Sequence, residues 1–246
     1  MIVPEIAGAA AAELDDLRAA CDAAVGRLLA AEPDVILVVG SGPADHAYRP
    51  GARDTFARFG VPLPVRLGGG RDAPGDPHPL PVSLLVGGWL LNRVAAPNIA
   101  ARSVPETSAV ARCRAVGREI SQRPEAVAVL VMGDGSACHG EKSPGYDDAR
   151  AIPYDQTVAA ALAGADVDAL LSLDSELSAE LRAAGRAAWQ VLAGAVEAAG
   201  GDWLAELAYH AAPYGVAYYV ASWQPAPRSG RDGSAGAAAA NRRRAT

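Results

Sequence analysis

The hydrophobic positions along the chain follow two periods, one typical of helices and one typical of buried strands. Residues 9 to 31 carry apolar side chains three or four positions apart with most charges on the other face, which predicts a helix that Pro33 ends. Residues 34 to 43, "DVILVVGSGP", form a continuous apolar and β-branched run that closes on a Gly-Ser-Gly-Pro turn. Such a run is typical of a strand buried on both faces.

The same criteria predict an alternation of strands and helices along the rest of the chain. Strands are expected at residues 62–68, 98–105 and 125–133, and a closing strand pair at 202–210 and 215–223. Helices are expected at 80–95, 106–123, 154–166 and 186–201, with helical turns at 168–173 and 175–185. This alternation predicts a three-layer α/β/α domain around a central mixed, partly parallel sheet.

The amino-acid composition indicates how many domains the chain forms and which residues fill its core. We expect a single domain over residues 1–224, because half of the 246 residues are hydrophobic and no internal boundary interrupts the pattern. Residues 225–246 have the Ala, Gly, Ser and Arg composition of a disordered tail, and residues 68–79 that of a mobile loop. The scarcity of aromatic residues, 5 %, implies a core filled mainly by Ala, Val and Leu.

Charge and cysteine usage narrow the classes of partner and compartment. A net charge of -6 argues against a nucleic-acid partner, which needs a basic face. No apolar run of membrane-spanning length and no signal peptide is visible, so no membrane partner is expected. Three widely separated cysteines favour reduced thiols over a disulfide framework or zinc knuckle, which predicts a cytoplasmic protein.

Two of the four histidines follow the ends of predicted strands. His46 comes just after the strand at 34–40, and His139 just after the strand at 125–133. The carboxyl ends of strands form the ligand crevice in open α/β sheets, so both are candidates to face a substrate or metal. The alternative is that each is a solvent-facing loop residue.

The turn "VVGSGP" also invites comparison with a dinucleotide-binding motif. The third glycine of that motif is missing, and Pro50 and Gly51 stand where its phosphate-binding helix should run. A nucleotide-dependent enzyme is therefore the third hypothesis, behind the two below.

Several segments in order resemble the LigB-type class III extradiol ring-cleavage dioxygenases, in particular a divergent bacterial branch of that family. The segments are "LPVSLLVGGWLL", "MGDGSACHGEKSPGYDDARAIPYDQTVAAAL", "GRAAWQVLAGAVEAAG" and "APYGVAYYVASW". In that family a strand ends in a Gly-x-Gly-Ser-x-x-His or Leu-Ser-His turn. Residues Gly133, Asp134, Gly135, Ser136 and His139 match that turn.

This resemblance implies a non-haem Fe(II) oxidoreductase that cleaves a catechol-like or other small aromatic compound. It implies that His139 is the catalytic acid/base, with Asp134 and Ser136 of the same turn binding substrate. Two histidines and one carboxylate hold the iron in such enzymes, and His46 is the candidate for one ligand. The oligomeric state is left open, with a homo-oligomer as one outcome.

The sequence departs from the family at the metal ligands. The family begins with a strand and a Pro-His-Pro segment that supplies the first ligand, whereas "MIVPEIAG" resembles the stretch after it. Trp189 and Gln190 stand where the third ligand is expected, with Glu197, Glu206 and His210 as substitutes. Either the chain is a dioxygenase with a degenerate Fe(II) site, or it is a non-catalytic small-molecule-binding or assembly protein that retains the fold and holds no cofactor.

Overall fold

The computed structural model describes residues 2–68, 75–96 and 98–227. The predicted tail lies outside these residues from position 228, as do residues 69–74 of the predicted mobile loop. At the N-terminus, Arg18 donates hydrogen bonds to the carbonyls of Ile2 and Ala11, and this holds the first turns against the helix that follows. The helix predicted from residue 9 becomes a regular α-helix only at Asp15, because residues 8–10 and 12–14 form 3-10 turns.

The central sheet has four strands in the order β2 (His46–Tyr48), β5 (Ile99–Val104), β1 (Val35–Ser41) and β6 (Val127–Met132). β5, β1 and β6 run parallel, and β2 runs antiparallel to β5. The carboxyl ends of the three parallel strands therefore share one edge, where Gly40 is in register with both Ser103 and Met132. The sheet is mixed and partly parallel, as the sequence predicted.

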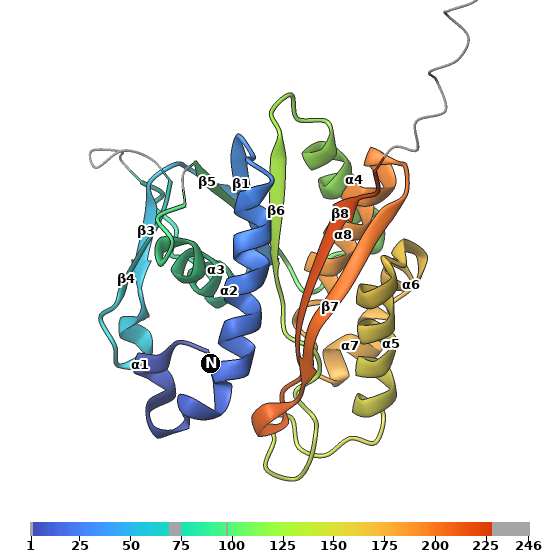
Figure 1. Cartoon of the computed structure of the whole chain (residues 1–246). Coiled ribbons are helices and arrows are strands. Elements are labelled where there is room, and N and C mark those ends of the chain that lie inside the picture. Colours follow the sequence, from blue (N-terminus) through green and yellow to red (C-terminus); the bar gives the residue numbers. More distant parts are fainter. Residues whose placement is uncertain (1, 69–74, 97, 228–246) are drawn as a thin grey trace, which may run out of the picture.

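Helices cover both faces of this sheet. Alternate residues of β1 point to opposite sides: Ile36 and Val38 pack in the core that contains α3 (Val82–Asn92), and Leu37 and Val39 in the core of α4 (Val110–Ser121) and α8 (Arg186–Ala199). The predicted α/β/α architecture is confirmed. Figure 1 shows β6 near the middle of the molecule, between the N-terminal half and a long C-terminal hairpin.

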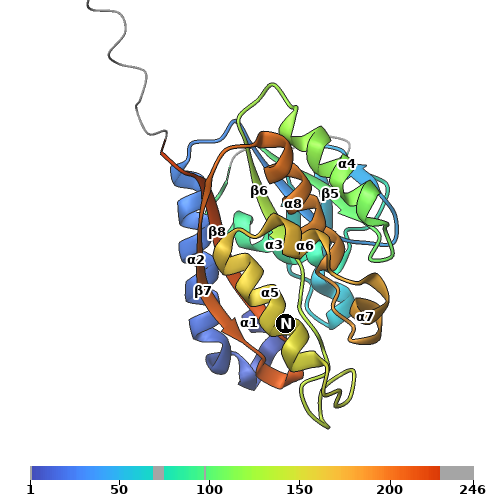
Figure 2. The same ribbon diagram turned by 90° about the vertical axis from the view of Figure 1, so that its right-hand side faces the viewer.

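That hairpin consists of β7 (Trp203–Ala211) and β8 (Tyr218–Pro225), which pair in antiparallel register with an irregularity between Leu207 and Tyr209. It contacts α2 (Asp15–Ala30) and α5 (Ala151–Gly164), which Figure 2 shows beside the two strands. The closing strand pair was predicted from its alternating pattern.

A second hairpin and several short helices complete the described chain. β4 (Pro64–Leu67) was predicted, whereas its partner β3 (Ala52–Thr55) was not. The remaining helices are α1 (Pro4–Ala7), η1 (Gly8–Ala10), η2 (Ala12–Leu14), η3 (Phe56–Phe59), α6 (Val167–Leu171), α7 (Ser175–Glu180) and η4 (Pro213–Gly215). Among the described residues, no helix combines the length and the apolar character needed to cross a bilayer.

Candidate functional site

The segment after β6, residues 133–139, leaves the sheet in an extended course between two other parts of the chain. On one side, Gly135 N–H donates to the Ala217 carbonyl at 2.8 Å and His139 N–H to the Gly215 carbonyl at 3.2 Å. On the other side, Ala137 N–H donates to the Leu181 carbonyl at 2.9 Å. These bonds fix the segment between the β7–β8 hairpin and the segment that leads into α8.

Gly133 and Gly135 are required by close approach rather than by an unusual backbone angle. A Cβ on Gly133 would lie 2.3 Å from the Gly185 Cα. A Cβ on Gly135 would lie 2.7 Å from both an Asp155 carboxylate oxygen and the Tyr219 hydroxyl. These glycines therefore leave room for neighbouring groups, and Gly135 in particular admits a carboxylate.

Asp155, in the second turn of α5, is the centre of this site. Its carboxylate is 1 % exposed and lies among four donors. Ser136 N–H donates to Oδ1 at 2.9 Å, and the Tyr219 hydroxyl donates to the same oxygen at 2.6 Å. The Ser136 hydroxyl and His139 Nε2 both contact Oδ2, the imidazole at 2.6 Å. A buried carboxylate with this many partners is anchored in position.

Tyr219 acts as a donor in this cluster. Burial raises the pKa of Tyr219, and the neighbouring Asp155 carboxylate raises it further, so the hydroxyl stays protonated. The tyrosine ring packs edge-on against Trp189, with 5.8 Å between ring centroids, and stacks on His210 at 4.9 Å. The hairpin therefore contributes one of the groups that hold Asp155.

The Asp155 contact sets the orientation of His139. An ionised carboxylate only accepts hydrogen bonds, so Nε2 must carry the proton and Nδ1 of the neutral ring is left as the acceptor. No hydrogen bond to Nδ1 is present within the described part of the chain, and 20 % of the side chain is exposed. A carboxylate that orients an imidazole in this way is the arrangement of a general acid/base.

The structure places the two predicted substrate-binding residues differently. Ser136 is completely buried and its hydroxyl contacts Asp155, so it positions the carboxylate and has no surface to offer a substrate. Asp134 keeps an accessible side chain, and no described residue hydrogen-bonds its carboxylate. Desolvation nevertheless raises the pKa of Asp134 to about 6. Of the two residues, Asp134 is the one with surface that a substrate could reach.

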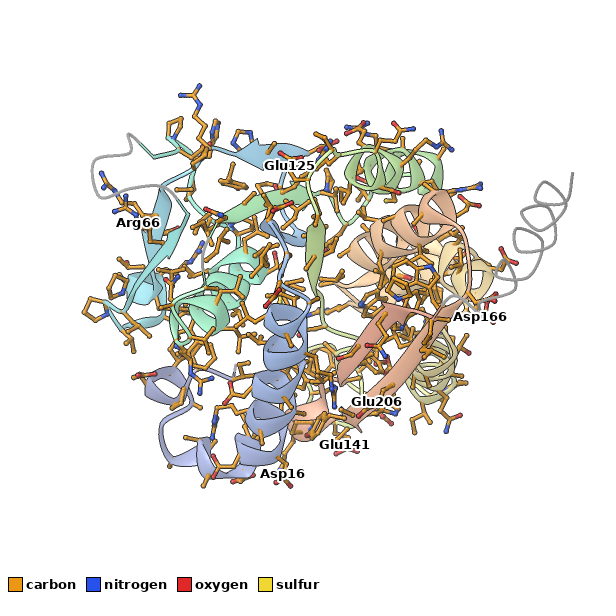
Figure 3. All side chains as sticks on the ribbon, turned by 45° about the horizontal axis from the view of Figure 1, so that its top comes forward. Asp16, Arg66, Glu125, Glu141, Asp166 and Glu206 are labelled. Carbon is orange, nitrogen blue, oxygen red and sulfur yellow. The ribbon has the colours of Figure 1, made fainter. Side chains whose placement is uncertain are left out.

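A groove of about 820 Å³ lies between β6 and the β7–β8 hairpin. Gly133 and Tyr219 line it, whereas Asp134, His139 and Asp155 are not among its lining residues. Its walls include four aromatic side chains: Trp189, Trp203, Tyr219 and Trp223. The volume falls in the range of about 300–1,000 Å³ typical of small-molecule sites. Glu125 and Glu206, labelled in Figure 3, belong to its charged lining, and Glu206 forms an ion pair with Arg27 of α2 at 2.9 Å. Tyr219 belongs to both the groove and the Asp155 cluster.

The residues around His139 do not form an iron site. Asp155 is surrounded by its donors, and the single group of three or more potential metal ligands within the described ranges lies elsewhere. Gln190, at the expected third ligand, is buried: its amide donates to the Leu170, Leu171 and Leu173 carbonyls and its oxygen accepts from Arg186. The substitutes have other partners: Glu197 pairs with Arg114, Glu206 with Arg27, and His210 stacks on Tyr219. We therefore assign no reaction step to iron beside His139.

His46 lies at the other end of the sheet and does not meet His139. It begins β2, which the strand order separates from β6 by three spacings, about 14 Å. There its Nε2 lies 3.1 Å from Asp76, and His78 Nδ1 lies 3.0 Å from the same carboxylate. The predicted metal ligand therefore has neighbours that can bind metal, but they are residues that the sequence did not single out.

Four residues of the two clusters were not predicted from the sequence: Asp155, Tyr219, Asp76 and His78. Asp155 had a detectable signal, because it shares a helix face with the apolar residues Ala151, Val158 and Leu162. Asp76 and His78 stand two positions apart in "GDPHP", but nothing local shows that this loop faces His46. Tyr219 lies in a predicted strand, and nothing in the sequence around it indicated that its hydroxyl contacts a carboxylate.

Comparison with known proteins does not assign this site: neither a family model nor a curated protein matches the chain.

Proposed function

We propose that this chain is an extradiol-dioxygenase-like oxidoreductase with a degenerate metal site, which binds a small, catechol-like aromatic compound and exchanges a proton with its hydroxyl through His139. The observation that carries this proposal is the hydrogen bond from His139 Nε2 to the buried Asp155 carboxylate. It leaves Nδ1 as the proton acceptor. Three free cysteines, Cys21, Cys113 and Cys138, support a reducing, cytoplasmic location.

The groove supports an aromatic ligand. Indole and phenol side chains bind planar rings through stacked or edge-to-face contacts, and Trp189 and Tyr219 already pack edge-on beside the Asp155 cluster. Asp134 adds a carboxyl group that changes protonation near pH 6 and has no hydrogen-bond partner among the described residues. Such a group accepts a hydrogen bond from a substrate hydroxyl when ionised.

In this proposal each protein group has a limited task. His139 Nδ1 takes the proton from an aromatic hydroxyl, and the resulting imidazolium is stabilised by the Asp155 carboxylate. Ser136 and Tyr219 hold that carboxylate, so they are positioning residues. Iron would supply oxygen activation in the related enzymes, but the residues beside His139 do not form its site.

The missing ligand set favours a second candidate, a binding protein that deprotonates its ligand without cleaving it. Both candidates predict binding of a catechol, and they differ in oxygen consumption. Their shared prediction can be tested with 4-nitrocatechol, whose visible absorption reports its ionisation.

We expect the wild-type chain to bind 4-nitrocatechol as its anion at a mildly acidic pH, at which the free compound is still the neutral phenol. His139→Gln should lose the anion signal and Asp155→Asn should weaken it, because each breaks the imidazole–carboxylate pair. Glu141→Gln is the matched control, since Glu141 is an exposed residue of the same loop and is not among the groups that hold Asp155 (Figure 3). An unchanged spectrum in His139→Gln would refute the proposal.

Oxygen uptake separates the two candidates. The protein is incubated anaerobically with Fe(II) and catechol, and oxygen is then admitted. Consumption of one O₂ per catechol, with formation of a ring-opened product, supports the dioxygenase. Anion binding without oxygen uptake supports the binding protein.

A further inference from the structure

His46, Asp76 and His78 form a cluster at the opposite end of the sheet from His139. His46 is the first residue of β2, and Asp76 and His78 belong to the loop that precedes α3. One donor atom from each residue lies within 4.8 Å of the others. The two imidazole rings are neighbours as well, with 4.5 Å between their centroids.

The donor distances match those of ligands on one metal ion. His46 Nε2 lies 3.1 and 3.2 Å from the two Asp76 oxygens, and His78 Nδ1 lies 3.0 Å from Oδ1. Ligands about 2.1 Å from an octahedral ion and at right angles to each other are about 3.0 Å apart. The three donor atoms lie within 4.8 Å of one another, so the rings have to move to bring all three atoms to one ion.

Asp76 is a prepared anionic ligand. Its side chain has no exposed surface, and its carboxylate accepts hydrogen bonds from the backbone N–H groups of Arg49 and His78 and contacts both imidazoles. The two backbone bonds fix the carboxylate and do not depend on the imidazoles. Replacing ring N–H donors by a cation keeps the charge of this carboxylate compensated.

The two histidines differ in exposure, and this leaves room for further ligands. The His78 side chain is 63 % exposed and that of His46 is 31 % exposed. An ion held here by three protein atoms would face solvent on the His78 side, where water or a small anion can complete its coordination. Two imidazoles and one carboxylate suit Zn²⁺ and the other late first-row divalent ions better than Mg²⁺ or Ca²⁺.

We propose that His46 Nε2, Asp76 and His78 Nδ1 bind one divalent transition-metal ion with solvent-facing positions left open. The site joins the loop before α3 to β2, so occupancy ties these two segments together. It is independent of the acid/base proposal: it is read out by metal binding alone, and it holds whether or not His139 takes a proton from a phenol.

Titration with Zn²⁺ and Co²⁺ tests the site on the full chain. After treatment with a chelator, we expect one equivalent of Zn²⁺ per chain in calorimetry, and visible Co²⁺ absorption bands that Zn²⁺ displaces. His46→Gln and His78→Gln should each weaken binding at least tenfold, because each removes one of three ligands. His210→Gln is the matched control for adventitious binding by an imidazole outside the cluster.

Thermal unfolding supplies a second measurement. Zn²⁺ should raise the melting temperature of the wild-type chain and of His210→Gln but not of His46→Gln or His78→Gln, because a ligand bound only to the folded state stabilises it. These two variants keep the buried carboxylate, so the test does not depend on the folding of Asp76→Asn. Equal Zn²⁺ affinity in wild type and both variants, or no binding by the wild type, would overturn the proposal.

Discussion

The two ends of the central sheet use the same pair of groups, an imidazole beside a buried carboxylate, in different surroundings. At the β6 end, the other donors to Asp155 are a backbone N–H and two hydroxyls from Ser136 and Tyr219. At the β2 end, the other donors to Asp76 are two backbone N–H groups and a second imidazole, His78. Backbone N–H groups and hydroxyls hold Asp155 beside one imidazole, which suits the orientation of a single base. Two imidazoles flank Asp76, and together with its carboxylate they supply three groups that can bind a metal ion.

The surroundings also differ in access to water. His139 is mostly enclosed, with 20 % of its side chain exposed, whereas His78 is largely exposed, at 63 %. Enclosure strengthens a single hydrogen-bonded pair because the local dielectric is low. Exposure leaves coordination positions open. The contrast between the sites therefore lies in the neighbours of the carboxylate rather than in the carboxylate itself.

Removing each carboxylate in turn should reveal the largest difference in stability between the two sites. We expect Asp155→Ala to lower the free energy of unfolding by about 3–5 kcal/mol, because it leaves buried donors on Ser136 and Tyr219 unpaired. Asp76→Ala should cost about 1–2 kcal/mol, since water can replace the carboxylate at the more exposed imidazoles. Urea denaturation of both variants without metal measures the difference. Equal losses would show that the exposure of the imidazoles does not set the cost of removing the carboxylate beside them.

A smaller change tests the close packing at the β6 end alone. Gly135→Ala should cost about 1–3 kcal/mol, because its Cβ would lie 2.7 Å from an Asp155 oxygen and the Tyr219 hydroxyl. It should also weaken the 4-nitrocatechol anion signal and leave Zn²⁺ binding unchanged. Gly26→Ala is the control: this helical glycine has no atom within 4 Å of the added Cβ, so the change should be neutral or stabilising. A stable Gly135→Ala variant with wild-type spectra would contradict the close approach.

The pH dependence of stability tests the raised pKa of Asp134, and because the residue is exposed, solvent screening makes this the smallest expected effect. Its pKa is raised from 3.8 to about 6, so the folded chain binds more protons than the unfolded chain between these values. The contribution of this group to stability therefore falls as pH rises from about 4 to about 6 and stays low above it. Asp134→Asn should lack this loss and be more stable relative to wild type at pH 7.5 than at pH 4. Parallel urea curves with a pH-independent difference would contradict the raised pKa.

Most of the fold could be predicted from the sequence because it depends on local periodicity. The run at β1 predicted a strand buried on both faces, and Ile36 and Leu37 do pack in cores on opposite sides. The turn "VVGSGP" was judged unlikely to bind a dinucleotide, and β1 indeed leads into β2 rather than into a helix. β3 was missed because its residues, "ARDT", carry no alternating apolar pattern.

The candidate sites were predictable only in part. Position after a strand singled out His139 and His46, one imidazole of each site, but not His78, the second imidazole beside Asp76. The carboxylate partners of His139 and His46 are separated from them by 16 and 30 residues. No local pattern relates residues at such distances, so the folded chain was needed to identify Asp155 and Asp76.

The sequence by itself determined most of the elements, the α/β class and the strand ends at which chemistry is expected, since these depend on the order of apolar and polar residues within short windows. It did not predict the short strands β2 and β3, which lie in a segment without an alternating apolar pattern. The tertiary structure decided which carboxylate each histidine meets, that Ser136 is buried while Asp134 is accessible, and that His46 and His139 lie at opposite ends of the sheet. These properties depend on strand order and on helix packing, which bring together residues far apart in the chain.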